Sequence, residues 1–226
     1  MLTLEKQFLI AIDGPVGAGK STVAKIAAKE LNIIYIDTGA MYRSVGLYVV
    51  RKGLNPKNSD DVNSVLDEIN LDVKLSAEGQ MIFLNGEDVT KLIRTPEISM
   101  AASDVSAIPE VRTKLVNIQR NLAASKSVIM DGRDIGTVVL PNATTKIFLI
   151  ASLDVRAERR YKELINKGQK VTLDEVKNDI IKRDNNDMSR EASPLKKADD
   201  AIELDTTNKS LTEVVTEVIN IVNRNK

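Results

Sequence analysis

The sequence predicts an α/β fold in which helices cover a five-stranded parallel sheet. Short apolar runs of strand length alternate with stretches of helical periodicity along most of the chain. A glycine-rich segment lies between the first apolar run and the first helical pattern, the order found in phosphate-binding α/β proteins. With 226 residues, of which 42% are hydrophobic, residues 1–226 are expected to form one domain with modest insertions.

Five apolar runs have the length and composition of buried strands. Helical patterns lie between them, and strands that are joined through helices favour a parallel sheet. The runs are Phe8–Ile12, Ile33–Ile36, Val128–Met130, Ile147–Ile150 and Ala201–Leu204.

Four helices are predicted on two separate grounds. Apolar residues recur at helical spacing in Ser21–Leu31 and Pro109–Lys126. Two further helices begin at capping boxes, in which a hydroxyl residue is followed three positions later by a glutamate. The capping pairs are Thr172 with Glu175 and Ser210 with Glu213.

Residues 63–103 interrupt this alternation. Leu71–Leu75 and Met81–Leu84 flank a turn-like segment, and Asn85-Gly86 offers a second turn. The pattern predicts a small antiparallel insert, which we interpret as a lobe on the substrate side.

A second interruption, Asp154–Gly168, is charged and helical in pattern. Three arginines lie close together in it, at Arg156, Arg159 and Arg160. A solvated helix is the ordinary explanation of such a run. The alternative is a helical lid over residues 153–171 that closes on the site and carries catalytic arginines.

The segment Gly14–Ser21 has the spacing G-x-x-x-x-G-K-S, which forms a backbone cage for nucleotide phosphates. Glycines let several N–H groups converge on anionic oxygens at the start of the following helix. Lys20 is expected to reach the β- and γ-phosphates, and the hydroxyl of Ser21 to bind Mg²⁺, which prefers oxygen ligands. The residues assigned to ATP are Gly14, Pro15, Val16, Gly17, Ala18, Gly19, Lys20, Ser21 and Thr22.

Polar residues follow two predicted strands at their carboxyl ends, where ligands bind in open α/β sheets. Asp37–Arg43 follow the second strand. Asp131 follows the third, at a position where a carboxylate can contact the water shell of Mg²⁺. Arg133 and Asp134 come next and place both signs of charge beside a small ligand, with pairing between the two as the alternative.

A third polar group comes later in the chain. Arg183, Asp187 and Arg190 lie four and three residues apart, so a helix would place them on one face. Two guanidinium groups around a carboxylate suit the recognition of phosphate and sugar. An ordinary salt-bridged helix end is the alternative explanation.

The composition excludes several classes of chemistry. Lys and Arg together number 32, as do Asp and Glu, so no overall positive charge attracts nucleic acid or an anionic membrane. The sequence contains no cysteine and no histidine, which removes disulfides, thiolate or imidazole metal sites and a histidine base. No apolar run reaches the length of a membrane span. We expect a monomeric, cytoplasmic protein with no nucleic-acid or membrane partner.

Together these segments resemble the cytidylate kinase family, the bacterial CMP and dCMP kinases among the nucleoside monophosphate (NMP) kinases. The resemblance covers essentially the whole chain, and its most specific parts are Gly132–Val138 and the Arg-Asp-x-x-Asp-x-x-Arg block at Arg183–Arg190. It implies a P-loop NTPase core, an NMP-binding insert at 63–103 and a short helical lid at 153–171.

The resemblance also implies roles for individual residues. Ser103, Arg112 and Asp134 would face cytosine, Asp187 with Arg190 the ribose, and Arg43, Arg133 and Arg183 the acceptor phosphate. Thr38, Tyr42 and Gly132 complete the substrate-binding set. The catalytic set is Lys20, Arg133, Arg156, Arg159, Arg160 and Arg183, and the metal set is Ser21 with Asp131 acting through water. A carboxylate beside a guanidinium is also complementary to the cytosine edge, where an amino donor adjoins two acceptors.

The predicted reaction is in-line transfer of the γ-phosphoryl group of ATP to CMP or dCMP, which needs no general base. A kinase for UMP, shikimate or gluconate would share the phosphate loop and is one alternative. A nucleotide-gated switch is another, but Asn208–Leu211 lacks the aspartate of its guanine-reading Asn-Lys-x-Asp segment. Thr38 replaces the serine of many relatives, and its methyl group leaves the balance between CMP and dCMP open.

Overall fold

The computed structural model describes residues 7–76 and 79–225, so residues 1–6, 77–78 and 226 of the predicted domain lie outside it. Within the described residues, five parallel strands form one sheet in the order β2-β6-β1-β7-β8. Each strand overlaps one of the predicted apolar runs, so the predicted sheet is confirmed. The strands are β1 (Leu9–Asp13), β2 (Ile34–Asp37), β6 (Val128–Gly132), β7 (Thr145–Ile150) and β8 (Ile202–Asp205).

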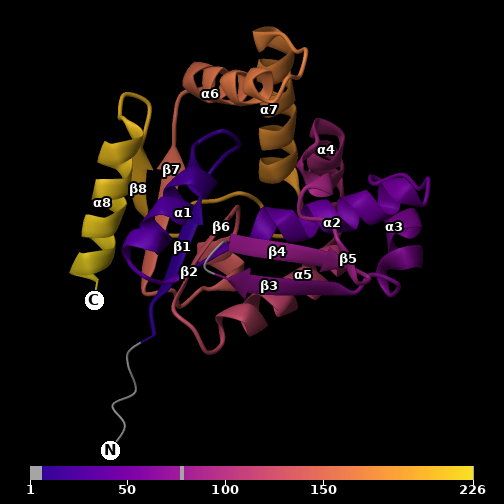
Figure 1. Ribbon diagram of the computed structural model, residues 1–226, viewed down its shortest axis with the longest axis horizontal. Helices are drawn as coiled ribbons and strands as arrows, with labels where there is room; N and C mark the ends of the chain where they lie inside the picture. The colour runs from indigo at the N-terminus through magenta and orange to yellow at the C-terminus, as the bar shows by residue number, and fades with distance from the viewer. Residues whose placement is uncertain (1–6, 77–78, 226) are drawn as a thin grey trace, which may run out of the picture.

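The two faces of the sheet are covered by different helices (Figure 1). Alternate residues of a strand point to opposite faces, so Ala11 packs in one apolar cluster while Ile10 and Ile12 pack in another. The cluster around Ile10 and Ile12 also takes in residues of α1 (Lys20–Glu30) and α8 (Leu211–Arg224). The cluster around Ala11 takes in residues of α2 (Thr38–Arg51) and α5 (Pro109–Ala123).

A second, smaller sheet forms in the interrupted region. Within the described residues its strands are antiparallel in the order β3 (Leu71–Ser76), β4 (Gly79–Leu84) and β5 (Glu87–Asp88). The antiparallel pairing expected there is confirmed. The sequence analysis did not predict the helical segments on either side, α3 (Ser59–Leu66), η1 (Leu92–Arg94) and α4 (Pro96–Val105).

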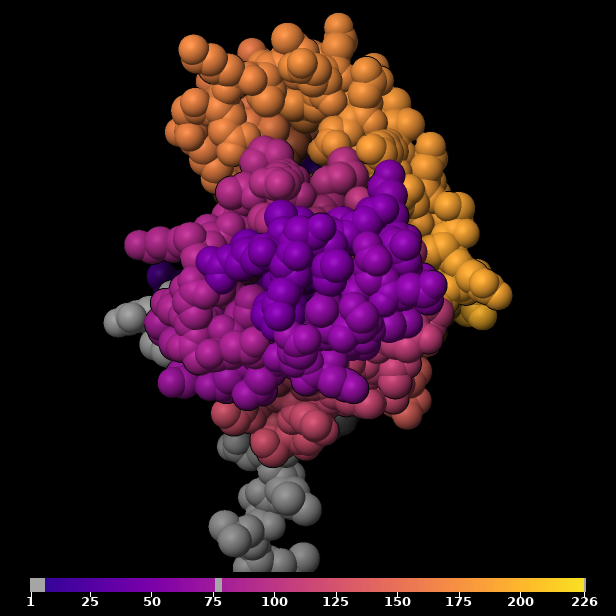
Figure 2. Space-filling view, turned by 90° about the vertical axis from the view of Figure 1, so that its right-hand side faces the viewer, coloured from indigo at the N-terminus to yellow at the C-terminus, as the bar shows by residue number. Residues whose placement is uncertain are grey.

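Two helices project from the core at one end of the molecule (Figure 1). They are α6 (Leu153–Asn166) and α7 (Leu173–Ser189), and in the perpendicular view they form the orange protrusion above the body (Figure 2). The predicted capping boxes at the starts of α7 and α8 are both present. No helix in the described part of the chain combines the length and apolarity that crossing a membrane requires.

Candidate functional site

A cleft of about 640 Å³ opens beside the glycine-rich loop, at the carboxyl ends of the strands. It extends from α1 and the start of α8 to α2 and the polar residues of α7. It brings together most of the residues that the sequence analysis assigned to the donor and the acceptor. These are Val16–Thr22, Thr38, Tyr42, Arg43, Ser103, Arg112, Asp131–Asp134, Arg159, Arg160, Arg183, Asp187 and Arg190.

The phosphate loop requires glycine at two positions, because a side chain there would clash with the neighbouring backbone. At Gly14, where φ is 146°, an added Cβ would lie 2.1 Å from the carbonyl oxygen of Leu149 in β7. At Gly17, where φ is 77°, it would lie 3.0 Å from both Cβ and the carbonyl oxygen of Arg156. The loop therefore packs directly on β7 and α6, which fixes the position of its N–H groups.

Lys20 lies at the start of α1 and is buried. Its ammonium group donates a hydrogen bond to the carbonyl oxygen of Pro15 at 2.7 Å. Burial, reinforced by the positive charge of Arg133, lowers the pKa of Lys20 to about 7. A cation under this penalty is stabilised by an anion beside it, so the position favours bound phosphate.

The proposed metal position contains oxygen donors. The hydroxyl of Ser21 donates to one carboxylate oxygen of Asp131 at 2.6 Å, and the hydroxyl of Tyr35 donates to the other at 2.8 Å. Burial, together with the negative charge of Asp37, raises the pKa of Asp131. Within the described residues, no group of three or more acidic side chains gathers to hold a metal ion. The donors therefore fit a Mg²⁺ ion that takes its other ligands from water and nucleotide phosphates.

Asp13 connects the phosphate loop to the acceptor side. Its carboxylate accepts hydrogen bonds from the N–H groups of Ile135 and Gly136, at 2.9 and 2.7 Å. These residues begin η2 (Ile135–Val139), a short π-helical turn that directly follows Asp134. Burial raises the pKa of Asp13 to about 6, against the effect of the two hydrogen bonds. This contact holds the turn after Asp134 against the strand that leads into the phosphate loop.

Arg112 and Asp134 form a buried ion pair on the acceptor side of the cleft. Arg112 also donates to the carbonyl oxygen of Ser106 at 3.1 Å, and its guanidinium carbon lies 5.5 Å from the centre of the Tyr42 ring. Arg190 approaches Asp134 at 3.8 Å and donates to the hydroxyl of Ser106 at 3.1 Å. Asp134 and Arg112, which the sequence analysis assigned to the base, therefore lie together, and Arg190, assigned to the ribose, lies beside them.

Several polar atoms around the cleft are buried and have no hydrogen-bond partner among the described residues. Such atoms are rare in folded proteins and call for a missing partner. They include Tyr42 Oη, Ser103 Oγ, Arg112 Nε, Arg183 Nε and Arg190 Nη2. Their concentration beside one cleft indicates a site that a polar ligand completes.

Positive charge exceeds what the nearby carboxylates neutralise. Arg133 donates to Asp187 at 2.7 Å through Nε. Burial, followed by repulsion from Arg133 and Arg43, lowers the pKa of Arg183 to about 10. Repulsion between neighbouring guanidinium groups is relieved when an anion enters, so this region can bind phosphate.

The three arginines of α6 have different surroundings. Arg159 lines the cleft and donates to the hydroxyl and the carbonyl oxygen of Thr206, at 3.0 and 2.7 Å. Arg160 also lines the cleft and donates to Glu163 at 2.7 Å. Arg156 does not line it, and neither do Gly14 and Pro15.

The guanidinium of Arg156 is buried between α6, α7 and the phosphate loop. It donates to the carbonyl oxygens of Val16 and Ala151, at 2.9 and 3.1 Å, and pairs with Asp184. Asp184 in turn accepts the N–H of Val16 at 3.0 Å. The sequence analysis placed Arg156 with the catalytic arginines, but the structure gives it contacts that hold the phosphate loop.

Five polar residues line the cleft that the sequence analysis did not assign. Asp37 and Ser106 lie on the acceptor side, Arg94 lies on the insert, Glu163 lies on α6, and Lys209 lies near the start of α8. Asp37 could have been found, because it directly follows the second predicted strand. Arg94 belongs to no local pattern, because only the folding of the insert brings it to the cleft.

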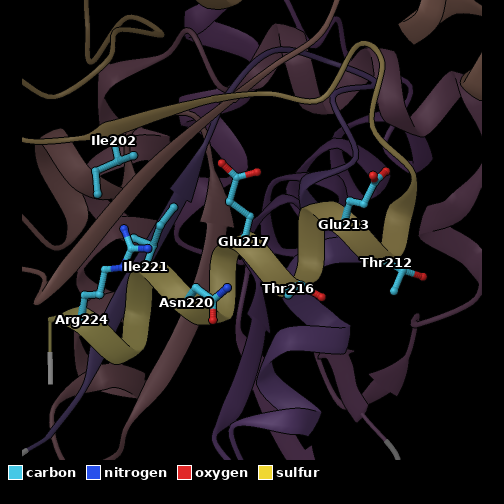
Figure 3. A pocket seen from close by; sticks show the side chains of 8 residues that line it. All are labelled: Ile202, Thr212, Glu213, Thr216, Glu217, Asn220, Ile221 and Arg224. Atoms are coloured by element: carbon cyan, nitrogen blue, oxygen red, sulfur yellow. The ribbon is translucent and has the colours of Figure 1, made fainter.

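A second hollow, of about 450 Å³, lies along α8 and the start of β8 (Figure 3). Its lining includes Glu213, which caps α8, and Glu217, which pairs with Lys209. No residue of the phosphate loop lines it. These acidic groups already have structural partners, so the chemistry of the molecule is concentrated in the larger cleft.

A phosphate loop at the edge of a parallel sheet, facing a polar pocket with excess guanidinium groups, defines a P-loop kinase. The protein-family model described as cytidylate kinase matches residues 10–224. The chain belongs to the cytidylate kinase family.

Individual relatives agree with this assignment. A protein named cytidylate kinase from Caldicellulosiruptor bescii is 52% identical over 216 residues, which cover 96% of each chain. Another, from Bacillus cereus, is 48% identical over 219 residues, which cover 97% of each chain. Among solved structures, an uncharacterized protein from Eubacterium ventriosum matches with a TM-score of 0.53 at 15% identity, over 96% of this chain and 99% of that one. That similarity concerns the fold alone.

Proposed function

We infer that this protein is a cytidylate kinase, which transfers the γ-phosphoryl group of ATP to CMP or dCMP and produces ADP with CDP or dCDP. The observation that carries the inference is the juxtaposition of the phosphate loop with the buried Arg112–Asp134 pair in one cleft. The family relationship supports the same reaction.

On the donor side, we propose that the N–H groups of the loop and the ammonium of Lys20 bind the phosphates of ATP. Ser21 directly, and Asp131 through water, would hold Mg²⁺. The metal ion, when bound, supplies charge neutralisation at the phosphates. Tyr35 supports this role of Asp131, because it donates to the carboxylate oxygen that Ser21 does not contact and so fixes the orientation of the carboxylate.

On the acceptor side, we propose that Asp134 accepts a hydrogen bond from the cytosine amino group while Arg112 donates to the ring acceptors. Ser103 and Tyr42 have buried hydroxyls without a described partner, which supports their place beside the base. Uracil presents an acceptor where cytosine presents the amino group. With uracil, the carboxylate of Asp134 would lose this amino donor and face an acceptor instead, at a cost of about 1–3 kcal/mol of binding free energy.

The phosphate of the acceptor would lie among Arg43, Arg133 and Arg183, and the ribose beside Asp187 and Arg190. The attacking group is already an anionic oxygen, so the protein has to align the two nucleotides and neutralise charge rather than remove a proton. Arg159 and Arg160 line the same cleft, which supports a role for them as the lid arginines.

Two parts of the fold would close on the nucleotides. We propose residues 63–103 as the NMP-binding insert and residues 153–171 as the lid, which exclude water and so limit hydrolysis of ATP. A monomeric state and a cytoplasmic location stay predictions from the sequence.

The test is a coupled assay of ADP formation with CMP, dCMP, UMP, AMP and shikimate at a fixed concentration of MgATP. We expect turnover with CMP and dCMP well above that with the other acceptors. Asp134→Asn should lower the preference for CMP over UMP by roughly tenfold or more, because the amide no longer presents only acceptors. Asp199→Asn, which alters an exposed carboxylate outside the insert and the lid, is the matched control. Failure of both cytosine nucleotides as acceptors would refute the inference.

A further inference from the structure

The small sheet contacts the core at Asp37 through the side chain of Gln80. The carboxamide oxygen of Gln80 accepts the N–H of Asp37 at 2.8 Å, and its amide nitrogen donates to the carbonyl oxygen of Asp37 at 3.0 Å. Asp37 ends β2, which lies at the edge of the five-stranded sheet. A carboxamide offers one donor group and one acceptor, as a peptide does. Gln80 therefore pairs with the end of β2 as a neighbouring strand would.

The side chain of Asp37 is held from the same direction. One of its oxygens accepts a hydrogen bond from Arg94, in η1, at 2.8 Å. The other accepts the N–H of Ala40 at 3.0 Å and so caps the start of α2. Arg43 approaches that second oxygen at 3.8 Å. The insert thus contacts Asp37 twice, at its main chain through Gln80 and at its carboxylate through Arg94.

This contact bears directly on the acceptor side of the cleft. The helix that Asp37 caps carries Thr38, Tyr42 and Arg43 in its first turns. Burial raises the pKa of Asp37, but Arg43 and Arg94 outweigh burial and keep the pKa below its ordinary value. The carboxylate is therefore charged and holds two guanidinium groups with a single negative charge.

Arg94 is also open to the cleft. Its side chain is 42% exposed and lines the cleft, whereas Asp37 is buried. Arg43 and Arg94 together carry one positive charge more than Asp37 neutralises. An anionic oxygen beside them would complete the charge balance and could accept further guanidinium N–H groups.

We propose that Gln80 is a positioning residue for the acceptor and that Arg94 is a further residue that binds the acceptor phosphate. Gln80 fixes the main chain where α2 begins, and so the direction of the side chains in its first turns. Arg94 contacts the phosphate beside Arg43 while Asp37 holds both guanidinium groups in place. The proposal rests on the proposed function, since it takes the acceptor to be a nucleoside monophosphate.

Gln80→Leu tests the positioning role, because leucine has a similar size but makes no hydrogen bond. We expect the Kd of CMP, measured by calorimetry without ATP, to rise roughly five- to tenfold. The KM of ATP should stay within about twofold, because Gln80 does not touch the phosphate loop. Thr90→Val is the matched control, since Thr90 accepts the N–H of Ile82 at 2.9 Å within the insert. An unchanged Kd for CMP, or a parallel rise in both constants, overturns the role.

Arg94→Met tests the phosphate contact. We expect it to raise the Kd of CMP roughly tenfold while the Kd of cytidine, which has no phosphate, stays within about twofold. Equal losses for CMP and cytidine overturn the contact. If the wild-type protein does not bind CMP, the proposed function is contradicted. If the wild-type protein and both variants bind CMP equally well, only the roles of Gln80 and Arg94 are contradicted.

Discussion

At the scale of single residues, Arg183 shows how the site is prepared for an anion. It lies on α7 beside Arg133 and Arg43, and burial with their repulsion lowers its pKa to about 10. Its Nε is buried without a hydrogen-bond partner among the described residues. The ligand-free protein therefore holds a charged group in an unfavourable environment, as functional sites often do.

Replacing Arg183 with methionine should change stability and substrate binding in opposite directions. Removing the buried charge should raise the free energy of unfolding by about 1 kcal/mol, seen as a melting temperature about 2–4 °C higher. The KM of CMP should rise at least roughly tenfold, because a phosphate contact is lost. Calorimetry and steady-state kinetics measure the two effects, and Arg224→Met, at an exposed arginine, is the control. A variant with lower stability and an unchanged KM contradicts this account of Arg183.

At the scale of elements, α6 and α7 hold the phosphate loop through a buried contact. Asp184 of α7 accepts the N–H of Val16, while Arg156 of α6 donates to its carbonyl oxygen and pairs with Asp184. Arg183 and Asp187 lie next to Asp184 on the same helix. The position of the donor loop is thus linked to the helix that presents acceptor-side residues.

Asp184→Asn should disturb this contact at nearly constant side-chain volume. We expect kcat/KM for ATP to fall roughly tenfold or more. Arg156 loses its charged partner, and the contact between Asp184 and the phosphate loop is weakened. Lys177→Ala is the matched control: Lys177 and Asp154 also join α7 to α6, but the pair is exposed and should contribute little. Equal kinetics for the two variants would show that the buried contact has no part in loop geometry.

The elements also show what sequence patterns can predict. The five strands and the capping boxes were predictable, because each depends on neighbours in sequence. The helix that begins at Thr38 was not predictable, since it follows β2 without a loop. Its N-cap, Asp37, is equally typical of a polar residue at the end of a strand. The π-helical turn after Asp134 depends on Asp13, more than a hundred residues earlier. Contacts of this kind leave no local pattern.

At the scale of the whole molecule, the cleft lies where three parts meet: the core, the insert and the projecting pair α6–α7. Motifs predicted the residues contributed by the core, because the phosphate loop and strand ends have fixed spacing. They could not assign Gln80 or Arg94, whose roles depend on how the insert packs. They also placed Arg156 with Arg159 and Arg160, although Arg156 pairs with Asp184, 28 residues later, and does not line the cleft.

Closure should appear as slower hydrogen exchange in residues 153–171. We expect deuterium uptake there to fall when a non-hydrolysable ATP analogue and CMP are bound together, because the lid would pack over them. Peptides from 218–225, at the end of α8, are the internal control. Uptake that is the same with and without nucleotides would contradict a closing lid.

The close approach of Gly14 to β7 has a consequence for protein engineering. The Cβ of any other residue at this position would clash with the main chain of Leu149, which cannot move because it belongs to a central strand of the sheet. Libraries that aim to alter donor preference should therefore leave this position untouched and vary the rim of the cleft, where the backbone tolerates new shapes.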